Sequence, residues 1–272
     1  MLSKNLIKTI KSLELKKFRN RDQLFVAEGP KVVEELMKKM SPTILIATDD
    51  WWQAQGLRAG ATADGTSGPD LQTGPARDGA TWLCVSEEEL RKVSFMQHPQ
   101  QVVAVFPLPV SAPLPSLASN ELCIALDGVQ DPGNVGTIVR IADWFGIHTV
   151  VCSADCADAF APKVVQATMG SLARVSVCYT DLSRFLADLP PQTPVYGTLL
   201  DGDDLYAQPL QSRGVIIFGN EGNGISLPIR PLVTHRLLIP SYPRHASTAE
   251  SLNVATAAAI VCAEFRRQSS AL

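Results

Sequence analysis

The chain has 272 residues, of which 46% are hydrophobic and 19% are charged, and its formal net charge is −3. This composition is ordinary for a globular protein, and no apolar run is long enough to span a bilayer, so we do not expect a membrane protein. The length exceeds that of a usual single domain and predicts two domains, each with its own core.

The first predicted element is an amphipathic helix at the basic N-terminus. Leu6, Ile7, Ile10 and Leu13 recur at intervals of three and four, the period of a helix with one buried face. Residues 1–21 carry seven lysines and arginines against one glutamate, a local charge of +6, which leaves −9 for the remainder. Such a cluster suits phosphate backbones, although a solvated helix face explains it equally well.

The same N-terminus bears on localisation. It lacks the continuous apolar segment and the cleavage site of a secretory signal, so we expect a cytoplasmic protein. A mitochondrial presequence is the alternative for such a basic start, but presequences usually carry more Arg and Ser.

Residues 1–106 are predicted to form a small αβ domain. After the first helix we expect a strand at "QLFVAEG", a helix at "PKVVEELMKKM", a strand at "TILIAT", and then strand, helix and strand at "WLCVS", "EEELRKVSF" and "QVVAVF". Residues 56–80 are rich in Gly, Ala, Thr and Asp, which predicts an exposed, mobile insertion.

A linker and a second domain follow. Residues 107–120 contain four prolines and no regular period, as expected of a linker. Residues 121–272 alternate β-branched runs with helical segments, including a helix from Gly136 to Phe145 and a final helix from Ser251. This alternation predicts an α/β domain with a mainly parallel sheet covered by helices on both faces.

The six cysteines lie at positions 84, 123, 152, 156, 178 and 262. No two of them form a CxxC pair, and most lie in apolar runs, so neither a zinc site nor a disulfide framework is indicated. We expect buried, reduced thiols and no metal.

The first polar loop of the second domain is "DPGNVGTIVR", which follows a predicted strand. Asn134 is a helix-capping residue type and Gly136 allows close backbone approach, so the corner has a structural explanation. Arg140 is harder to explain, because its neighbours along the helix are apolar. An arginine in such a place is usually paired with an acid or reserved for an anion.

The second loop is "FGNEGNGIS", directly after the apolar strand "GVIIF". Its glycines free the backbone to present N–H groups, and Glu221 is its only charged residue. The spacing matches neither the dinucleotide nor the nucleoside-triphosphate fingerprint. A carboxylate beside flexible backbone can instead bind hydroxyl or amino groups.

The third loop, "IPSYPRHASTAESLNVATAAA", ends in a helix of small apolar residues. Ser251 is predicted to cap this helix, which would place Asn253 in its first turn, at the positive end of the dipole. Capping explains Ser251 more easily than it explains Asn253.

These three motifs, in this order, resemble those of the SpoU (TrmH) family of RNA 2′-O-ribose methyltransferases in the SPOUT superfamily, over residues 121–267. The first domain, through "KKFR" and "LFVAEGPKVVEEL", resembles the RNA-binding substrate domain of ribosomal RNA members. The loop before "SLNV" is longer than in many members, and the insertion at 56–80 is not part of the pattern.

The resemblance implies a fold and a cofactor. Family members have a C-terminal trefoil knot in which S-adenosyl-L-methionine lies bent, and they act as homodimers. The residues that correspond to the cofactor site are Thr198, Leu199, Gly202, Phe218, Gly219, Asn220, Gly222, Ile239, Ser241 and Leu252.

It also implies a reaction, methyl transfer to a ribose 2′-hydroxyl of structured RNA. The extra N-terminal domain favours large-subunit ribosomal RNA over transfer RNA, and an RNA-binding ribosome assembly factor without turnover is the alternative of a different class. The catalytic residues would be Asn134, Arg140, Glu221, Ser251 and Asn253, and the RNA-binding residues Lys16, Lys17, Arg19 and Arg21. We expect Arg140, a poor base, to stabilise the developing alkoxide, and Asn134 to fix the ribose.

Overall fold

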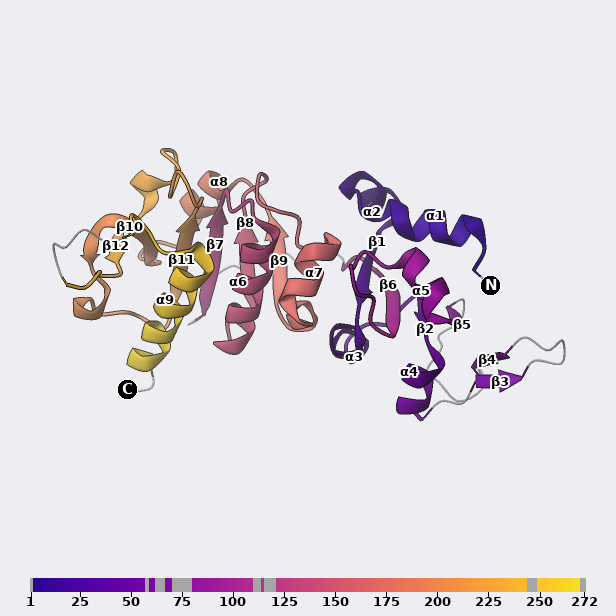
Figure 1. The fold of residues 1–272 in the computed structure, drawn as a ribbon. Coiled ribbons are helices and arrows are strands. Elements are labelled where there is room, and N and C mark those ends of the chain that lie inside the picture. Colours follow the sequence, from indigo (N-terminus) through magenta and orange to yellow (C-terminus); the bar gives the residue numbers. More distant parts are fainter. Residues whose placement is uncertain are drawn as a thin grey trace. The chain divides into compact units, whose positions relative to one another are not determined.

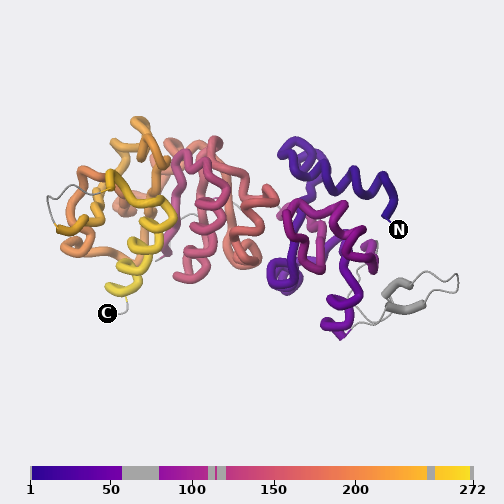
Figure 2. Tube along the Cα trace, in the orientation of Figure 1, coloured from indigo at the N-terminus to yellow at the C-terminus, as the bar shows by residue number. Residues whose placement is uncertain are grey.

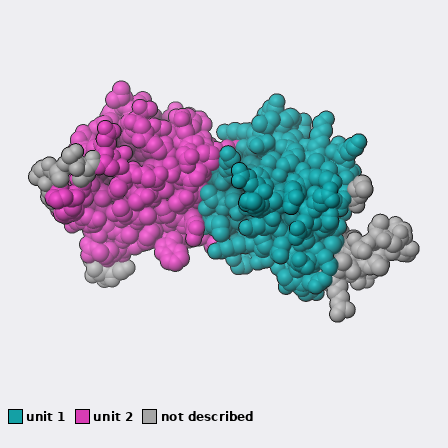
Figure 3. Space-filling model, in the orientation of Figure 1, with its two compact units in different colours: residues 1–110, 160–173 teal, residues 111–159, 174–272 magenta. Residues whose placement is uncertain are grey.

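The computed structural model describes residues 2–56, 80–109, 114, 121–243 and 249–269, together with the backbone of 59–61 and 67–69. Contacts divide the chain into two compact units, residues 1–110 with 160–173 and residues 111–159 with 174–272 (Figure 3). The segment 160–173, which we expected in the second domain, thus groups with the first unit. Most of the predicted insertion and linker lies outside the described residues, and the domain limits 1–106, 107–120 and 121–272 stay a prediction.

The first unit is built on a four-stranded sheet of order β1-β6-β2-β5 (Figure 1). The central strand β6 is antiparallel to β1 and β2, and β2 is parallel to β5. The strands are β1 (Leu24–Glu28), β2 (Ile44–Ala47), β5 (Thr81–Cys84) and β6 (Val102–Pro107), and a separate antiparallel pair joins β3 (Ala59–Ala61) to β4 (Ser67–Pro69).

The helices of this unit are α1 (Lys4–Ser12), α2 (Lys16–Asp22), α3 (Pro30–Met37), α4 (Asp49–Ala54), α5 (Glu87–Val93), α7 (Pro162–Thr168) and the 3₁₀ turn η1 (Ser171–Ala173). The predicted elements are present, and α2 and α4 are additional. These two helices have seven and six residues, too few to show a helical period in the sequence. Ile10 and Leu13 are fully buried in the core beside Val26 and Val103, so the N-terminal helix is part of the domain.

Arg19 differs from expectation. It is only 2% exposed, and its Nη1 donates to the carbonyl oxygens of Leu13 and Glu14 at 2.8 and 2.7 Å. The prediction that Arg19 binds RNA is therefore wrong, because its guanidinium is taken up by the turn between α1 and α2. Lys17 and Arg21 are exposed on α2 and lie against the ring of Phe18. Arg21 also forms a bidentate ion pair with Asp22, at 2.7 and 2.8 Å, which a phosphate backbone would have to displace or share.

The second unit contains a six-stranded sheet of order β12-β10-β11-β7-β8-β9, parallel throughout, which confirms the predicted α/β class. Its strands are β7 (Leu122–Asp127), β8 (Thr149–Cys152), β9 (Ser176–Tyr179), β10 (Val195–Asp204), β11 (Gly214–Gly219) and β12 (His235–Leu238). Its helices are α6 (Pro132–Trp144), α8 (Leu182–Ala187) and α9 (Val254–Ser269), with 3₁₀ turns η2 (Leu205–Ala207) and η3 (Arg230–Leu232).

Helices cover both faces of this sheet. Cys123 and Ala125 of β7 point toward α8, where they join a buried cluster with Leu182 and Phe185. The alternate residues point to the opposite face, where α6 packs on β8 and α9 on β11. The path of the chain in Figure 2 shows α9 returning alongside α6.

The strand order places a switch point between β7 and β11. From β7 the chain continues to β8 and β9 on one side, and later returns to β10, β11 and β12 on the other. The register pairs Gly219 with Asp127, so the two strands end level with each other. Loops that leave such neighbouring ends in opposite directions open a crevice, which is where open parallel sheets bind ligands.

None of the six cysteines forms a disulfide; five are buried, as predicted, and Cys84 is half-buried. Cys156 lies close to the carbonyl oxygen of Leu126, its Sγ at 3.3 Å. A hydrogen bond from Cys152 lowers the pKa of Cys156 to about 7. No helix within the described part of the chain is long and apolar enough to cross a membrane.

Candidate active site

Three predicted site residues form a chain of hydrogen bonds at the switch point. Asn134 Nδ2 donates to Glu221 Oε1 at 2.8 Å, and Asn253 Nδ2 donates to Asn134 Oδ1 at 2.9 Å. In the sequence, Glu221 follows Asn134 by 87 positions and Asn253 follows it by 119 positions. The side chain of Asn134 therefore joins the loop after β7, the loop after β11 and the start of α9.

Chemistry at both ends fixes the direction of this chain. Asn253 Oδ1 accepts from the backbone N–H groups of Ala255 and Thr256 at 3.0 and 3.2 Å, which leaves only its amide nitrogen to face Asn134. Glu221 Oε1 is the acceptor in its bond with Asn134, so it pairs with the amide nitrogen. Both constraints give the same orientation of the Asn134 amide.

The start of α6 differs from the prediction. Asp131 Oδ1 accepts from the backbone N–H of Asn134 at 2.8 Å, and Pro132 occupies the first helical position. Asp131 therefore caps a helix that begins at Pro132 rather than Gly136, and Asn134 is not the cap. Because the cap is supplied by Asp131, the amide of Asn134 is left to join the loops.

The start of α9 also differs. The helix begins at Val254 with Asn253 as its cap, so the prediction that Ser251 caps it is wrong. Asn253 is the capping residue because its side-chain oxygen accepts from two N–H groups of the first turn. Ser251 is exposed two residues earlier and forms no hydrogen bond to another residue that the structure describes.

The loop after β11 is a tight turn that holds Glu221 at its tip. The backbones of Asn220 and Gly224 bond to each other in both directions, at 3.0 and 2.9 Å. Asn220 Oδ1 accepts from the N–H groups of Gly222 and Asn223, and its Nδ2 donates to Gly128 O at 2.8 Å. The side chain of Asn220 therefore shapes the turn and ties it to the loop after β7.

Asp127 is a site residue that the sequence analysis missed. Its side chain is 8% exposed, and its Oδ2 accepts from the backbone N–H of Ser226 at 2.7 Å. This bond fixes the far end of the loop that carries Glu221. The available signal was an acid at the end of the buried strand "LCIALD", where a carboxylate needs a partner.

The predicted cofactor segment on β10 leaves the regular sheet. The ladder with β12 shifts register between Thr198 and Asp203, so residues 199–202 bulge out of it. Asp201 in this bulge accepts from Arg230 Nη2 at 2.8 Å and from Arg236, and the latter bond lowers the pKa of Asp201. These ion pairs hold the bulge against Arg236 of β12 and Arg230 of η3.

The remaining predicted cofactor residues lie at the same edge of the sheet. Ile239 and Ser241 follow β12 directly, and β12, β10 and β11 are neighbours. Phe218 is fully buried, so its side chain belongs to the core. The predicted Leu252 is 49% exposed, whereas the predicted Leu199 is buried and its neighbour Leu200 is 72% exposed. Exposed leucines beside a strand that bulges out of its ladder suit a ligand that is part apolar and part hydrogen-bonding.

Arg140 lies outside the hydrogen-bonded chain. It follows Asn134 by six residues on α6, about 9 Å along the helix and on a different face. It is exposed and forms no hydrogen bond or ion pair with the described residues. Trp144, one turn further along, is 85% exposed. Arg140 and Trp144 therefore share an outward stripe of α6.

Comparison with known families decides what this site belongs to. The profile described as "SpoU rRNA Methylase family" matches residues 121–263, which hold the sheet of the second unit and all of its predicted catalytic residues. The chain belongs to the SpoU rRNA methylase family. The profile "MRM3-like substrate binding domain" matches residues 4–104.

Relatives of this SpoU protein match it over nearly its full length. The 23S rRNA (guanosine(2553)-2′-O)-methyltransferase RlmP of Bacillus subtilis is 34% identical over 263 residues, 96% of this chain and 95% of the relative. A structure from Porphyromonas gingivalis, assigned to the TrmH family of RNA methyltransferases, has 40% identity and a TM-score of 0.82, with 98% and 99% of the chains covered. The AdoMet-bound rRNA methyltransferase of Sinorhizobium meliloti has 29% identity and a TM-score of 0.79, with 98% and 96% covered.

The groups at the candidate site of this SpoU protein fit S-adenosylmethionine better than a metal ion. No group of three or more His, Cys, Asp or Glu side chains that could hold a metal ion occurs among the described residues. A nucleoside with an apolar thioether chain instead needs backbone groups and apolar contacts. The bulge at 199–202, the turn at 219–222 and Leu252 supply both.

The close packing of Gly219 gives a test of the Glu221 turn. A Cβ at Gly219 would lie 2.2 Å from the backbone carbon of Gly224, whereas one at Gly222 would meet nothing closer than Asn220 Oδ1 at 3.6 Å. We expect Gly219→Ala to lower the free energy of unfolding of the second unit by about 2 to 3 kcal/mol, and Gly222→Ala by less than about 1 kcal/mol. Urea unfolding followed by circular dichroism measures both. Equal stability of the two variants would show that the turn is not packed as described.

Proposed function

We propose that this chain methylates a ribose 2′-hydroxyl of large-subunit ribosomal RNA. It is an S-adenosylmethionine-dependent RNA methyltransferase by family, and the named relatives that act on 23S ribosomal RNA support this class of substrate. The observation that carries the proposal is the chain from Asn253 through Asn134 to Glu221 at the switch point. S-adenosylmethionine, when bound, supplies an electrophilic methyl group on a sulfonium.

In this proposal Asn134 orients the ribose. Its amide has two N–H donors and two acceptor lone pairs, and the bonds to Glu221 and Asn253 use one of each. One donor and one acceptor remain, held in a fixed direction. A ribose hydroxyl both donates and accepts, so this pair can hold it at the reacting distance of about 3 Å. Glu221 and Asn253 then act as positioning residues, and exposed Ser251 contacts the RNA or the cofactor.

The cofactor is proposed to lie at the ends of β10, β11 and β12. Thr198, Leu199 and Gly202 border it on one side, and the backbone from Phe218 to Gly222 on another. Ile239, Ser241 and Leu252 complete the site. The trefoil knot of the family is part of this proposal, and the return of the chain after β12 to Asn134 supports it.

A homodimer is proposed because Arg140 lies away from the other predicted catalytic residues of its own subunit. The exposed stripe of Arg140 and Trp144 on α6 points away from the Asn134 chain of its own subunit. An obligate dimer would cover Trp144 and bring Arg140 to the site of the partner subunit. There its fixed positive charge would stabilise the alkoxide that forms as the 2′-hydroxyl loses its proton.

Two further parts of the proposal concern the setting of the reaction. We place the enzyme in the cytoplasm with ribosomal RNA, and Lys16, Lys17 and Arg21 on α2 as contacts to the RNA backbone. Transfer RNA is the second candidate substrate, and an assembly factor without turnover is the rival function. Glu221 and Asn253 are exposed and Asn134 is half-buried, which favours a role toward a ligand over a purely structural one.

The function is tested by ribose-methylation mapping of ribosomal RNA from cells with and without the gene, followed by reaction of the unmethylated RNA with purified protein. We expect one nucleotide of the large-subunit RNA to lack its ribose methyl group in cells without the gene. Purified protein should restore that methyl group to the isolated RNA. Asn134→Ala should lower kcat by about 100-fold and change the S-adenosylmethionine Kd by less than about threefold, because Asn134 faces the ribose. Cofactor binding without methyl transfer to either RNA class would instead support the assembly factor.

The dimer is tested by mixing two inactive variants, Arg140→Ala and Asn134→Ala. If each site combines Arg140 of one subunit with Asn134 of the other, half of the exchanged dimers carry one intact site. Activity should then recover to about a quarter of the wild-type value. A mixture that stays as inactive as its components would show that both residues act within one subunit.

A further inference from the structure

The first unit carries a cleft that none of the site residues above lines. Its volume is about 380 Å³, within the range of small-ligand sites, about 300 to 1,000 Å³. Pro30, Leu90 and Pro99 give it apolar walls, and Glu87, Arg91 and Gln100 give it polar groups. The cleft lies between the start of α3, one face of α5 and the segment that leads into β6.

The polar side chains of this cleft are not used by the fold. Glu87 and Arg91 lie one turn apart on α5, yet they form no ion pair with each other. Neither they nor the Gln100 amide make a hydrogen bond to any residue that the structure describes. The guanidinium of Arg91, the carboxylate of Glu87 and the amide of Gln100 are therefore open to a ligand.

The backbone around these groups is held in unusual conformations. Gln101 has a φ of 24°, which is rare outside glycine, and Gly29 has a φ of 84°. The two positions are fixed by bonds from Gly29 N to Val102 O at 2.9 Å and from Thr48 N to Gln101 O at 2.8 Å. A Cβ at residue 29 would lie 3.0 Å from Gln100 Oε1. Because residue 29 is glycine, the Gln100 side chain can occupy its position at the cleft without a clash. Strained backbone held in this way is common at binding sites.

The combination of groups points to a nucleotide. A guanidinium binds phosphate, an amide reads a base edge in both directions, and a carboxylate accepts from an exocyclic amino group. The proline and leucine walls suit the flat face of a base. In a duplex these edges and faces are covered, whereas an unpaired RNA nucleotide presents all of them.

We propose that this cleft binds one unstacked nucleotide of the substrate RNA, and so serves as a recognition subsite of the first unit. The inference rests on the proposed RNA substrate. It adds a place at which the enzyme reads a single-stranded feature of that RNA, apart from the phosphate contacts of α2. Arg91 holds the phosphate, while Gln100 and Glu87 contact the base.

The test uses the full chain and two fluorescein-labelled probes, a single-stranded RNA of 12 nucleotides and the blunt duplex of the same sequence. We expect fluorescence anisotropy to give a Kd for the single strand at least about fivefold below that of the duplex. Arg91→Ala should weaken single-strand binding by about tenfold, Gln100→Ala by about threefold, and duplex binding by less than twofold in each case.

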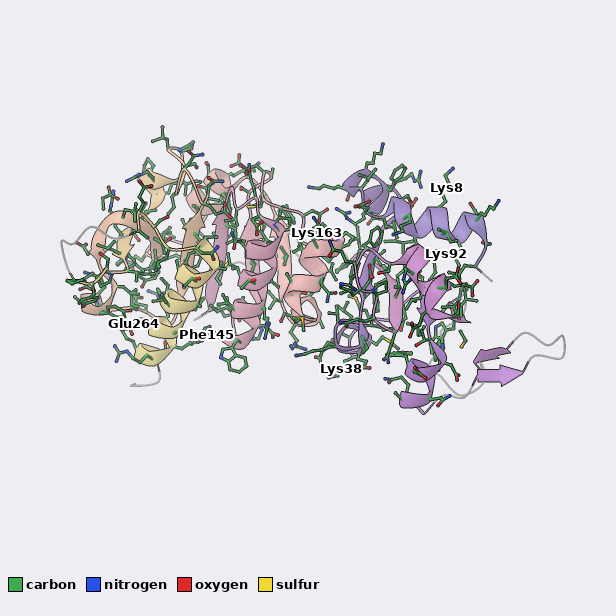
Figure 4. The ribbon with its side chains drawn as sticks, viewed as in Figure 1. Lys8, Lys38, Lys92, Phe145, Lys163 and Glu264 are labelled. Atoms are coloured by element: carbon green, nitrogen blue, oxygen red, sulfur yellow. The ribbon has the colours of Figure 1, made fainter. Side chains whose placement is uncertain are left out.

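Lys92→Ala is the matched control, because Lys92 lies on the same helix (Figure 4), carries the same charge and does not line the cleft. It should shift both probes by the same small factor. Equal effects of Arg91→Ala and Lys92→Ala would overturn the subsite, since only the overall charge would then matter. Competition by a free nucleoside monophosphate as effective as by the RNA strand would also overturn it, in favour of a free-nucleotide site.

The outcome is separable from that for the proposed function. S-adenosylmethionine binding belongs to the second unit and should be unchanged in all three variants. If the wild-type chain methylates RNA while Arg91→Ala and Lys92→Ala bind alike, the subsite fails and the function stands. If the wild-type chain transfers no methyl group, the function fails whatever the cleft binds.

Discussion

The site depends on the side-chain amide of Asn134, which joins three segments that are remote in the sequence. Its donor is directed by a carboxylate and its acceptor by an amide that is itself fixed as a helix cap. Each neighbour favours the same orientation, so removing one would weaken the direction of the Asn134 amide, and removing both would leave it free to rotate by half a turn and exchange donor for acceptor. The pair of hydrogen bonds thus converts a symmetric group into a directed one, which is what recognition of a hydroxyl requires.

The rest of the second unit keeps these segments in place. The parallel sheet brings the ends of β7 and β11 level, and Asp127 and Asn220 tie the loops that follow them to each other's backbone. On the other side of β11, the bulge of β10 is clamped by Asp201 with Arg230 and Arg236. The groups that we propose to face the ligand are therefore held by hydrogen bonds and ion pairs within the second unit, and the proposed dimer would use the exposed stripe of Arg140 and Trp144 on α6.

Much of this arrangement could be predicted from the sequence, because the C-terminal ends of parallel strands must meet at one edge. The motifs around Asn134, Glu221 and Asn253 follow strands or open a helix, and the structure brings these three residues together. The helix starts could not be predicted, because each offers two capping residues within three positions and only the folded backbone selects Asp131 and Asn253. The charge of Arg19 predicted that it binds RNA. Composition cannot show that its side chain is buried and donates to two carbonyl oxygens.

A double-mutant cycle between Asn134 and Glu221 tests the central claim most directly. The methyl-transfer kcat is measured for Asn134→Ala, Glu221→Gln and the double variant. If Glu221 acts by directing the Asn134 amide, its substitution has little further effect once Asn134 is gone, and the coupling energy is at least about 1 kcal/mol. Effects that add within about 0.3 kcal/mol would contradict the account, because the two side chains would then act independently.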